Sequence, residues 1–148
     1  MIEPELGYNF RNRALLRQAL THSSSLSEAK KTRSGSNERL ATLGDAVLGL
    51  VVAARLYSDS KETYLTSAKG DLTIERSNVV NNERLAEFST QLGLQQHLVV
   101  SPGQKNLGIG VGMLAEVYEA IVGAIFLDSG YAQASEFIHR TVLPATIS

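Results

Sequence analysis

The fold of this 148-residue chain is decided by the stretch Asn37-Glu38-Arg39-Leu40-Ala41-Thr42-Leu43-Gly44-Asp45-Ala46-Val47-Leu48-Gly49-Leu50. Apolar residues recur along it at steps of three and four, which predicts a helix with one apolar stripe that continues to about Tyr57. Ser36 or Asn37 is the expected N-cap, and Glu38 suits the positive end of the helix dipole. The stripe consists of Leu40, Leu43, Val47, Leu50 and Val51.

Two features of this predicted helix lower its stability. Asp45 stands among apolar residues, and a carboxylate in such surroundings needs a partner or a metal ion. Gly44 and Gly49 each lower helix stability by roughly 1 kcal/mol relative to Ala. We therefore expect another part of the molecule to approach the helix backbone here.

The composition describes an ordinary globular chain, and its length predicts a single domain over residues 1–148. It has no cysteine, which excludes disulfides and thiolate metal sites. No run of 18 apolar residues and no signal peptide is present, so we expect no membrane partner and a cytoplasmic location, with an organelle as the alternative. The net charge of −1 excludes binding to nucleic acid by bulk charge alone.

A second helix is predicted over 111–128, and it is apolar almost all round, which is typical of a buried central helix. Glu116 and Glu119 interrupt it three residues apart, so they share one face. Two carboxylates on one face of a buried helix repel each other unless a cation lies between them. The pair is therefore a candidate metal site.

Both helices resemble the ribonuclease III family. The first resembles its signature Asn-Glu-Arg-Leu-Glu-Phe-Leu-Gly-Asp-Ala/Ser, and the second its motif Ala-Asp-x-x-Glu-Ala-x-x-Gly-Ala/Gly-x-Phe/Tyr-x-Asp. The opening of the chain, which ends in Ala19-Leu20-Thr21-His22-Ser23, is similar to that family too. The matching residues are Asn37, Glu38, Arg39, Leu40, Leu43, Gly44, Asp45 and Ala46 in the first motif, and Glu119, Ala120, Gly123 and Asp128 in the second.

This resemblance implies an all-α homodimer that cuts double-stranded RNA with Mg²⁺, for which Mn²⁺ is a substitute. It assigns catalysis to Asp45 and Glu119 and metal binding to Asp45, Glu116 and Glu119, with Glu38 in support. Two such ions lie about 4 Å apart in two-metal hydrolysis. We expect no double-stranded-RNA-binding module after the terminal helix predicted over residues 131–142, although bacterial relatives often carry one.

The chain departs from the family at two predicted ligands. Ala41 stands where the family has Glu, and Glu116 stands where it has Asp. Glu38 is about 10 Å from Asp45 along the helix axis, so it is no simple replacement for a ligand at position 41. Glu116 carries its carboxylate about 1.5 Å further than Asp would. The two departures together are what compensation would produce, and also what loss of catalysis would produce.

Other segments give weaker predictions. Lys30, Lys31 and Arg33 lie in a predicted loop and are candidate phosphate contacts; a solvated loop is the alternative. His22 is expected to fix the loop after it rather than act as a base. A short element is predicted near 62–68, a helix over 71–88 with a bend at Asn81, and a glycine-rich flexible loop over 101–112.

Two functions remain open from the sequence. The first is a metal-dependent endoribonuclease that acts on double-stranded RNA. The second is a weakened or inactive relative that serves as an RNA-binding or ribosome-associated scaffold. A third interpretation, in which the acids only face solvent or pair with arginines, is weaker because two motifs match in order.

Overall fold

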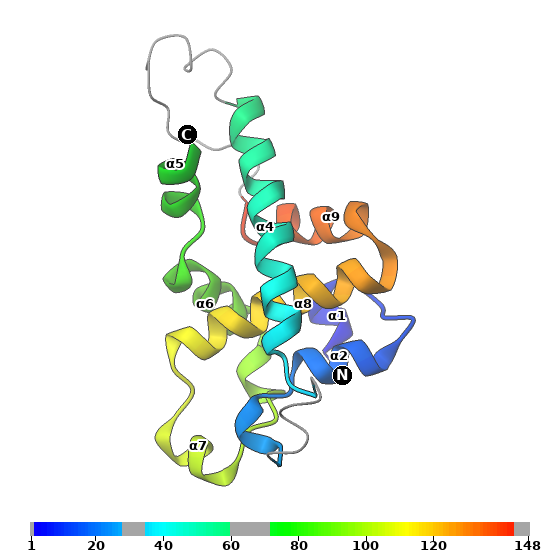
Figure 1. The fold of residues 1–148 in the computed structure, drawn as a ribbon, viewed down its shortest axis with the longest axis vertical. Helices are drawn as coiled ribbons and strands as arrows, with labels where there is room; N and C mark the ends of the chain where they lie inside the picture. Colours follow the sequence, from blue (N-terminus) through cyan, green and yellow to red (C-terminus); the bar gives the residue numbers. More distant parts are fainter. Residues whose placement is uncertain (1, 28–34, 60–71, 144–148) are drawn as a thin grey trace.

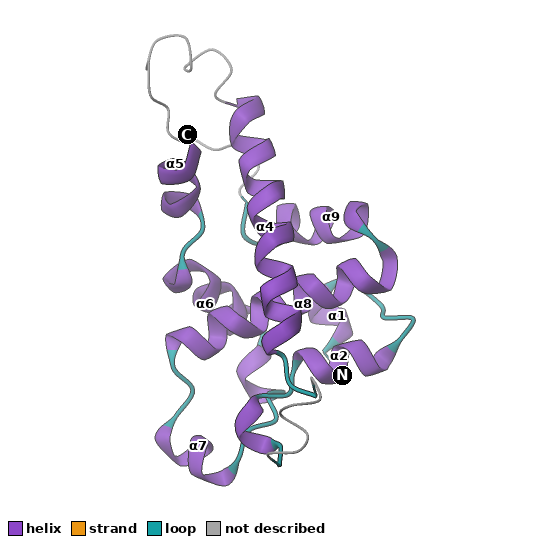
Figure 2. Cartoon of the chain, in the orientation of Figure 1, coloured by secondary structure: helices purple, strands orange, loops and turns teal. Residues whose placement is uncertain are grey.

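The structure is a computed structural model that describes residues 2–27, 35–59 and 72–143. Within these ranges the regular structure is helical, apart from one isolated bridge that joins Thr21 to Val99 (Figure 2). The predicted all-α class is therefore confirmed.

The central element is α8 (Val111–Ser129), the second helix that the sequence predicted. Nearly all of its side chains between Ala115 and Ile125 are buried. The signature helix α4 (Glu38–Asp59) crosses it and makes the most extensive helix–helix contact among the described residues (Figure 1). Around this pair lie α1 (Glu3–Leu6), α2 (Arg13–Ala19), η1 (Ser23–Ser25), α5 (Leu72–Val79), α6 (Asn82–Gln91), η3 (Leu94–Gln96), α7 (Pro102–Leu107) and α9 (Tyr131–Thr141).

Two glycines allow α4 and α8 to cross in backbone contact. A Cβ placed on Gly44 would lie 1.7 Å from the Glu119 carbonyl oxygen, and one on Gly123 would lie 2.2 Å from the Leu40 carbonyl oxygen. Neither position has room for a methyl group, and backbone atoms cannot move aside as a flexible side chain can. The expectation that something approaches the backbone at Gly44 is confirmed.

The start of α4 is tied to the N-terminal part of the chain. The Ser36 hydroxyl accepts a hydrogen bond from the Glu38 N–H at 3.4 Å, which satisfies the first backbone donor of α4. The Asn37 side chain is buried instead and donates to the Ala19 carbonyl at 3.2 Å, while its backbone N–H donates to the Thr21 carbonyl at 2.8 Å. These bonds fix where the signature helix begins.

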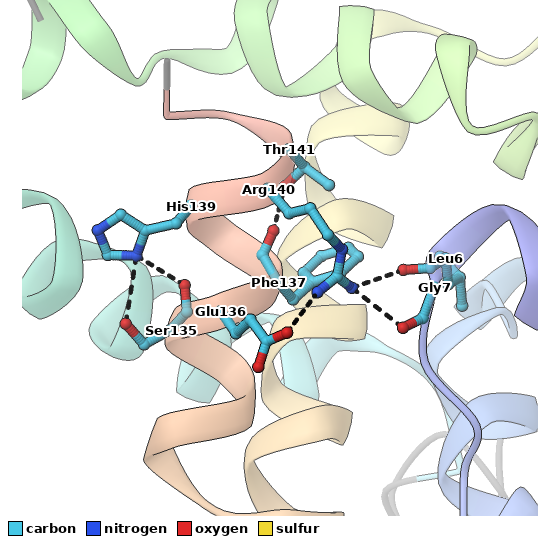
Figure 3. A network of polar contacts seen from close by, with 8 residues as sticks. All are labelled: Leu6, Gly7, Ser135, Glu136, Phe137, His139, Arg140 and Thr141. Atoms are coloured by element: carbon cyan, nitrogen blue, oxygen red, sulfur yellow. Dashed lines mark hydrogen bonds and ion pairs between the residues drawn. The ribbon is translucent and has the colours of Figure 1, made fainter. Parts of the chain in front are cut away.

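The last helix closes the fold by binding the first turn. Arg140 on α9 donates to the carbonyl of Leu6 at 2.9 Å and to that of Gly7 at 3.3 Å (Figure 3). Its guanidinium also pairs with Glu136 and lies 5.7 Å from the centre of the Phe137 ring. Gly7 takes a left-handed backbone conformation with φ of 67°, which brings its carbonyl within reach of Arg140.

Three sequence predictions are refined by the structure. The bend expected near Asn81 is a full break between α5 and α6, because the Asn81 side chain caps α6 by accepting from the Arg84 N–H at 3.0 Å. The segment over 101–112 is not simply a flexible loop: Ser101 caps α7 and Pro102 begins it. Leu50, expected in the apolar stripe, is 58% exposed. The element predicted near 62–68 lies outside the described residues.

By length and composition, α4 is also apolar enough to cross a membrane, with a mean hydropathy of 1.6 over its most apolar window. This is weak evidence for a span, because the core helix of a protein that never enters a membrane has the same character. Here α4 packs against α8 along the core.

The glycine crossing predicts the effect of two substitutions. Gly44→Ala and Gly123→Ala should each lower the free energy of unfolding by about 3 kcal/mol or more, because each added methyl overlaps a carbonyl of the other helix. Urea denaturation measures this. Gly112→Ala is the matched control: a Cβ there meets nothing within 4 Å, so we expect a change of at most about 1 kcal/mol, in the stabilising direction. Equal losses in all three variants would contradict the account.

Candidate metal centre

An open hollow of about 380 Å³ lies where α4 crosses α8, beside the start of α6. All four carboxylates that the sequence predicted as site residues line it, together with the position where the family has a further Glu. The lining residues are Glu38, Ala41, Thr42, Asp45, Asn82, Gly112, Ala115, Glu116 and Glu119.

The glycine crossing explains why the acids converge. Asp45 directly follows Gly44 on α4, and Glu119 is the residue of α8 whose carbonyl faces Gly44. The backbone contact therefore brings these two side chains to the same side of the crossing. Glu116 lies one turn before Glu119 on the same face of α8, and Glu38 lies two turns before Asp45 on α4.

Glu119 and Asp45 share a hydrogen bond, and Glu119 keeps its proton at neutral pH. Burial, the hydrogen bond to Asp45 and the negative charges of Asp45 and Glu116 together raise the pKa of Glu119 to about 8, and burial contributes most. A protonated Glu119 therefore donates to the Asp45 carboxylate. A shared proton holds two carboxylates close together, and a metal cation can replace that proton between them.

The surroundings of Asp45 differ from the sequence prediction. It is exposed to solvent rather than enclosed by apolar residues. The apolar stripe of α4 faces α8, and Asp45 lies at its edge, where the crossing opens into the hollow. The cost of desolvating a carboxylate falls instead on Glu119, which is half-buried.

Glu116 and Glu38 form a second acidic pair. Burial raises the pKa of Glu116, the negative charge of Glu38 raises it further, and the charge of His22 lowers it. Glu116 therefore lies within electrostatic reach of Glu38 on α4 and of Glu119 on its own helix. Ala41 lies between the two acidic residues of α4 and offers only a methyl group, 7% exposed.

His22 fixes its loop, as predicted. Its Nδ1 accepts from the Ser24 N–H at 3.1 Å and lies 2.8 Å from the Ser24 hydroxyl. That hydroxyl accepts from the Ser101 N–H at 3.0 Å, while the His22 N–H donates to the Val99 carbonyl at 2.9 Å. The loop thus holds the segment that leads to α7 and keeps the imidazole within electrostatic reach of Glu116.

Asp128, the last residue of the second motif, serves the fold and not the hollow. Its carboxylate accepts from the backbone N–H groups of Arg11 and Asn12 at 2.8 and 2.9 Å, and from the Tyr8 hydroxyl at 2.6 Å. Although burial alone would raise the pKa of Asp128, these hydrogen bonds outweigh it and lower that pKa. The motif thus combines site residues with an anchor for the segment before α2.

The carboxylates that line the hollow suit a hard divalent ion, although they do not surround one completely. In the part of the chain that the structure describes, no three His, Cys, Asp or Glu side chains are arranged to hold a metal ion. Carboxylate oxygens are the ligands that Mg²⁺ prefers, and Mg²⁺ commonly keeps several waters with one or two carboxylates. The proton-sharing pair of Asp45 and Glu119 meets that requirement.

Comparison with known proteins decides the family. A family model described as Ribonuclease-III-like matches residues 12–146. The chain belongs to the ribonuclease III family. Ribonuclease 3 of Bdellovibrio bacteriovorus is 39% identical over 145 residues, 97% of this chain, and ribonuclease 3 of Symbiobacterium thermophilum is 41% identical over 136 residues, 91% of this chain. The chain spans only 60% and 55% of the length of these relatives.

The fold of this ribonuclease III family member is also that of solved nuclease domains. Two structures of the nuclease domain of ribonuclease III from Campylobacter jejuni superpose with TM-scores of 0.82 and 0.84, at 35% and 33% identity. They cover 96% and 99% of this chain, and 93% and 96% of their own chains are covered. One of them concerns flexibility in a region involved in dimer formation.

Sequence reasoning missed some residues of the site and placed others where the structure does not reach. Asn82, which begins α6, lines the hollow, and its only signal was a polar residue after the expected bend. Lys30, Lys31 and Arg33, the predicted phosphate contacts, lie outside the described residues. Their role stays a prediction.

The raised pKa of Glu119 predicts how stability depends on pH without divalent ions. In EDTA, the free energy of unfolding should fall as the pH rises from about 5 to about 8, because the folded chain keeps the Glu119 proton that the unfolded chain releases. Glu119→Gln removes that proton and should flatten the slope. The exposed Glu83→Gln is the control and should leave it unchanged. Urea denaturation across this pH range measures the free energy of unfolding. Equal slopes for wild type and Glu119→Gln would show that Glu119 does not carry the extra proton.

Proposed function

We propose that this chain is a metal-dependent endoribonuclease that hydrolyses phosphodiester bonds of double-stranded RNA. The observation that supports this most is the pair formed by Asp45 and Glu119, which share a proton in an open hollow that Glu38 and Glu116 also line. Membership of the ribonuclease III family and the names of its relatives support the same reaction. We further propose that residues 1–148 act as one domain in the cytoplasm, without a membrane partner.

Asp45 and Glu119 would hold Mg²⁺ or Mn²⁺, with Glu116 and Glu38 completing the acidic lining. The ions, when bound, activate water and stabilise the oxygen that leaves. The chain's own residues supply the rest. Glu119 would give up its proton so that it can ligate, and Asp45, exposed at the rim, would hold the ion where an approaching phosphate can reach it. The hollow is open, which suits a strand that lies across it.

Ala41 favours a second candidate function, a binder that no longer cuts. A Glu at this position would lie about 6 Å along the axis from Asp45, within reach of a shared ion. Here the methyl group of Ala41 leaves that part of the hollow without a ligand. Such a chain would keep the fold and the RNA surface and act as an RNA-binding or ribosome-associated scaffold.

Cleavage of a long double-stranded RNA with Mg²⁺ or Mn²⁺ separates the two functions. The nuclease predicts products from the wild type that fall at least about 100-fold in Asp45→Asn, because a ligand is lost. It also predicts faster cleavage by Ala41→Glu. If only Ala41→Glu cuts, the natural chain has lost catalysis through one ligand. If neither cuts while both bind RNA, the scaffold function holds and the nuclease proposal is refuted.

A homodimer is the second part of the proposal. The outer side of α4 leaves apolar side chains in solvent: Leu50 is 58% exposed and Tyr57 is 65% exposed, two turns apart on one helix. Exposed apolar groups on one face commonly mark an association surface. The related nuclease domain from Campylobacter jejuni has a region involved in dimer formation.

The homodimer predicts that Leu50→Asp converts the protein to monomers, because a carboxylate would be buried at the interface. Light scattering measures the mass directly. Leu107→Asp, which changes an 84% exposed residue on α7, is the control and should leave the mass unchanged. A wild type that already runs as a monomer would contradict this part of the proposal.

A further inference from the structure

A second hollow of about 170 Å³ lies between α4 and α5. It meets the acidic hollow at Asp45, which lines both. Unlike the acidic hollow, it contains an arginine. Its lining residues are Asp45, Leu48, Gly49, Val52, Arg76, Ser77 and Val80.

The absence of a side chain at Gly49 leaves space for the guanidinium of Arg76. A Cβ added to Gly49 would be 3.0 Å from Nη1 of Arg76 and 3.9 Å from its Cζ, so the guanidinium rests against bare helix backbone. Gly49 is four residues after Asp45, which is about 6 Å along the axis of α4. The missing side chain therefore brings a cation to within one helical turn of the predicted metal ligand.

The guanidinium of Arg76 carries several donors in a planar fork. Among the described residues, no carboxylate forms an ion pair with it within 4.0 Å. Arg76 is exposed and lines the second hollow, which adjoins the acidic hollow at Asp45. A guanidinium in this setting matches a phosphate, which accepts two hydrogen bonds from such a fork.

We propose that Arg76 is a substrate-positioning residue that binds a phosphodiester of the RNA beside the one brought to Asp45 and Glu119. The proposal rests on the proposed function for the identity of the ligand. Phosphates recur along each RNA strand, so a strand that crosses Asp45 presents a neighbouring phosphate toward α5. Gly49 acts with Arg76, because it leaves room for the guanidinium between the two helices.

Binding of a short blunt-ended RNA duplex, followed by fluorescence anisotropy in Mg²⁺ at several salt concentrations, tests this. The background is Glu119→Gln, which blocks cleavage with a neutral side chain of nearly the same shape as protonated Glu119 and does not line the second hollow. Arg76→Ala should weaken binding about tenfold and reduce the slope of log K against log salt by about 1. The affinity of Arg76→Lys should lie between those of the background chain and Arg76→Ala, because Lys keeps the positive charge but lacks the planar fork of donors.

A matched control comes from the same helix pair. Arg55→Gln removes a positive charge from α4, but that guanidinium is bound to Asp59 at 2.8 Å. It should leave the slope unchanged. A slope that falls equally in Arg55→Gln and Arg76→Ala would show a general charge effect and overturn the proposal.

Gly49→Ala separates binding from folding, because Ala favours a helix more than Gly does. Its methyl would push the Arg76 guanidinium away by a few tenths of an ångström, so it should weaken RNA binding in the background chain by less than Arg76→Ala does, and have no further effect in Arg76→Ala. Equal losses in both, or an Arg76→Ala chain with unchanged affinity and slope, would overturn the proposal. Failure of the proposed nuclease is seen separately, as a wild type that binds the duplex but does not cut it. A wild type that binds no duplex overturns both.

Discussion

Contact between the backbones of α4 and α8 is the constraint on which the rest of the structure depends. Gly44 and Gly123 each face a carbonyl of the other helix with no space for a methyl group. At that separation, α8 becomes the buried axis of the fold and α4 lies directly on it. The same contact determines the chemistry, because Asp45 and Glu119 adjoin the contact and are forced together at its open side. Fold and site thus have one cause, and it explains why Gly44 and Gly123 lie inside helices although Gly disfavours helices.

Much of this could be predicted from the sequence. The periodicity over 37–57 and the nearly unbroken apolar run over 111–128 predicted the two central helices, and the spacing of Glu116 and Glu119 placed both on the face that lines the hollow. What failed depended on three-dimensional context. Asp45 was expected to be buried because its neighbours in sequence are apolar, yet burial depends on which side of α4 meets α8. The helix at Pro102 was obscured by surrounding glycines, although Ser101-Pro102 is a recognisable start signal. Arg76 comes near Asp45 only through the packing of α5 on α4, which no local pattern contains.

The two departures from the family motifs fall within one arrangement of charges. With Ala41 in place, the four acids still line one hollow and act on one another: Asp45 and Glu116 raise the pKa of Glu119, and Glu38 raises that of Glu116. Glu116 and Ala41 both line this hollow, and the negative charge of Glu38, one turn before Ala41, raises the pKa of Glu116. An Asp at position 116 would be about 1.5 Å shorter and would face Glu38 less closely. The substitution at 116 is therefore linked physically to the one at 41, because both affect the same wall of the hollow.

The central claim is that the helix crossing makes Asp45 and Glu119 a cation site that is held by a shared proton until an ion binds. Calorimetric titration of Mg²⁺ or Mn²⁺ near neutral pH, in buffers of different ionisation enthalpy, measures binding and proton release together. The wild type should bind the ion and release up to about one proton, which Glu119 supplies, and Asp45→Asn should lose the binding. Binding without proton release, or binding that survives Asp45→Asn unchanged, would contradict it.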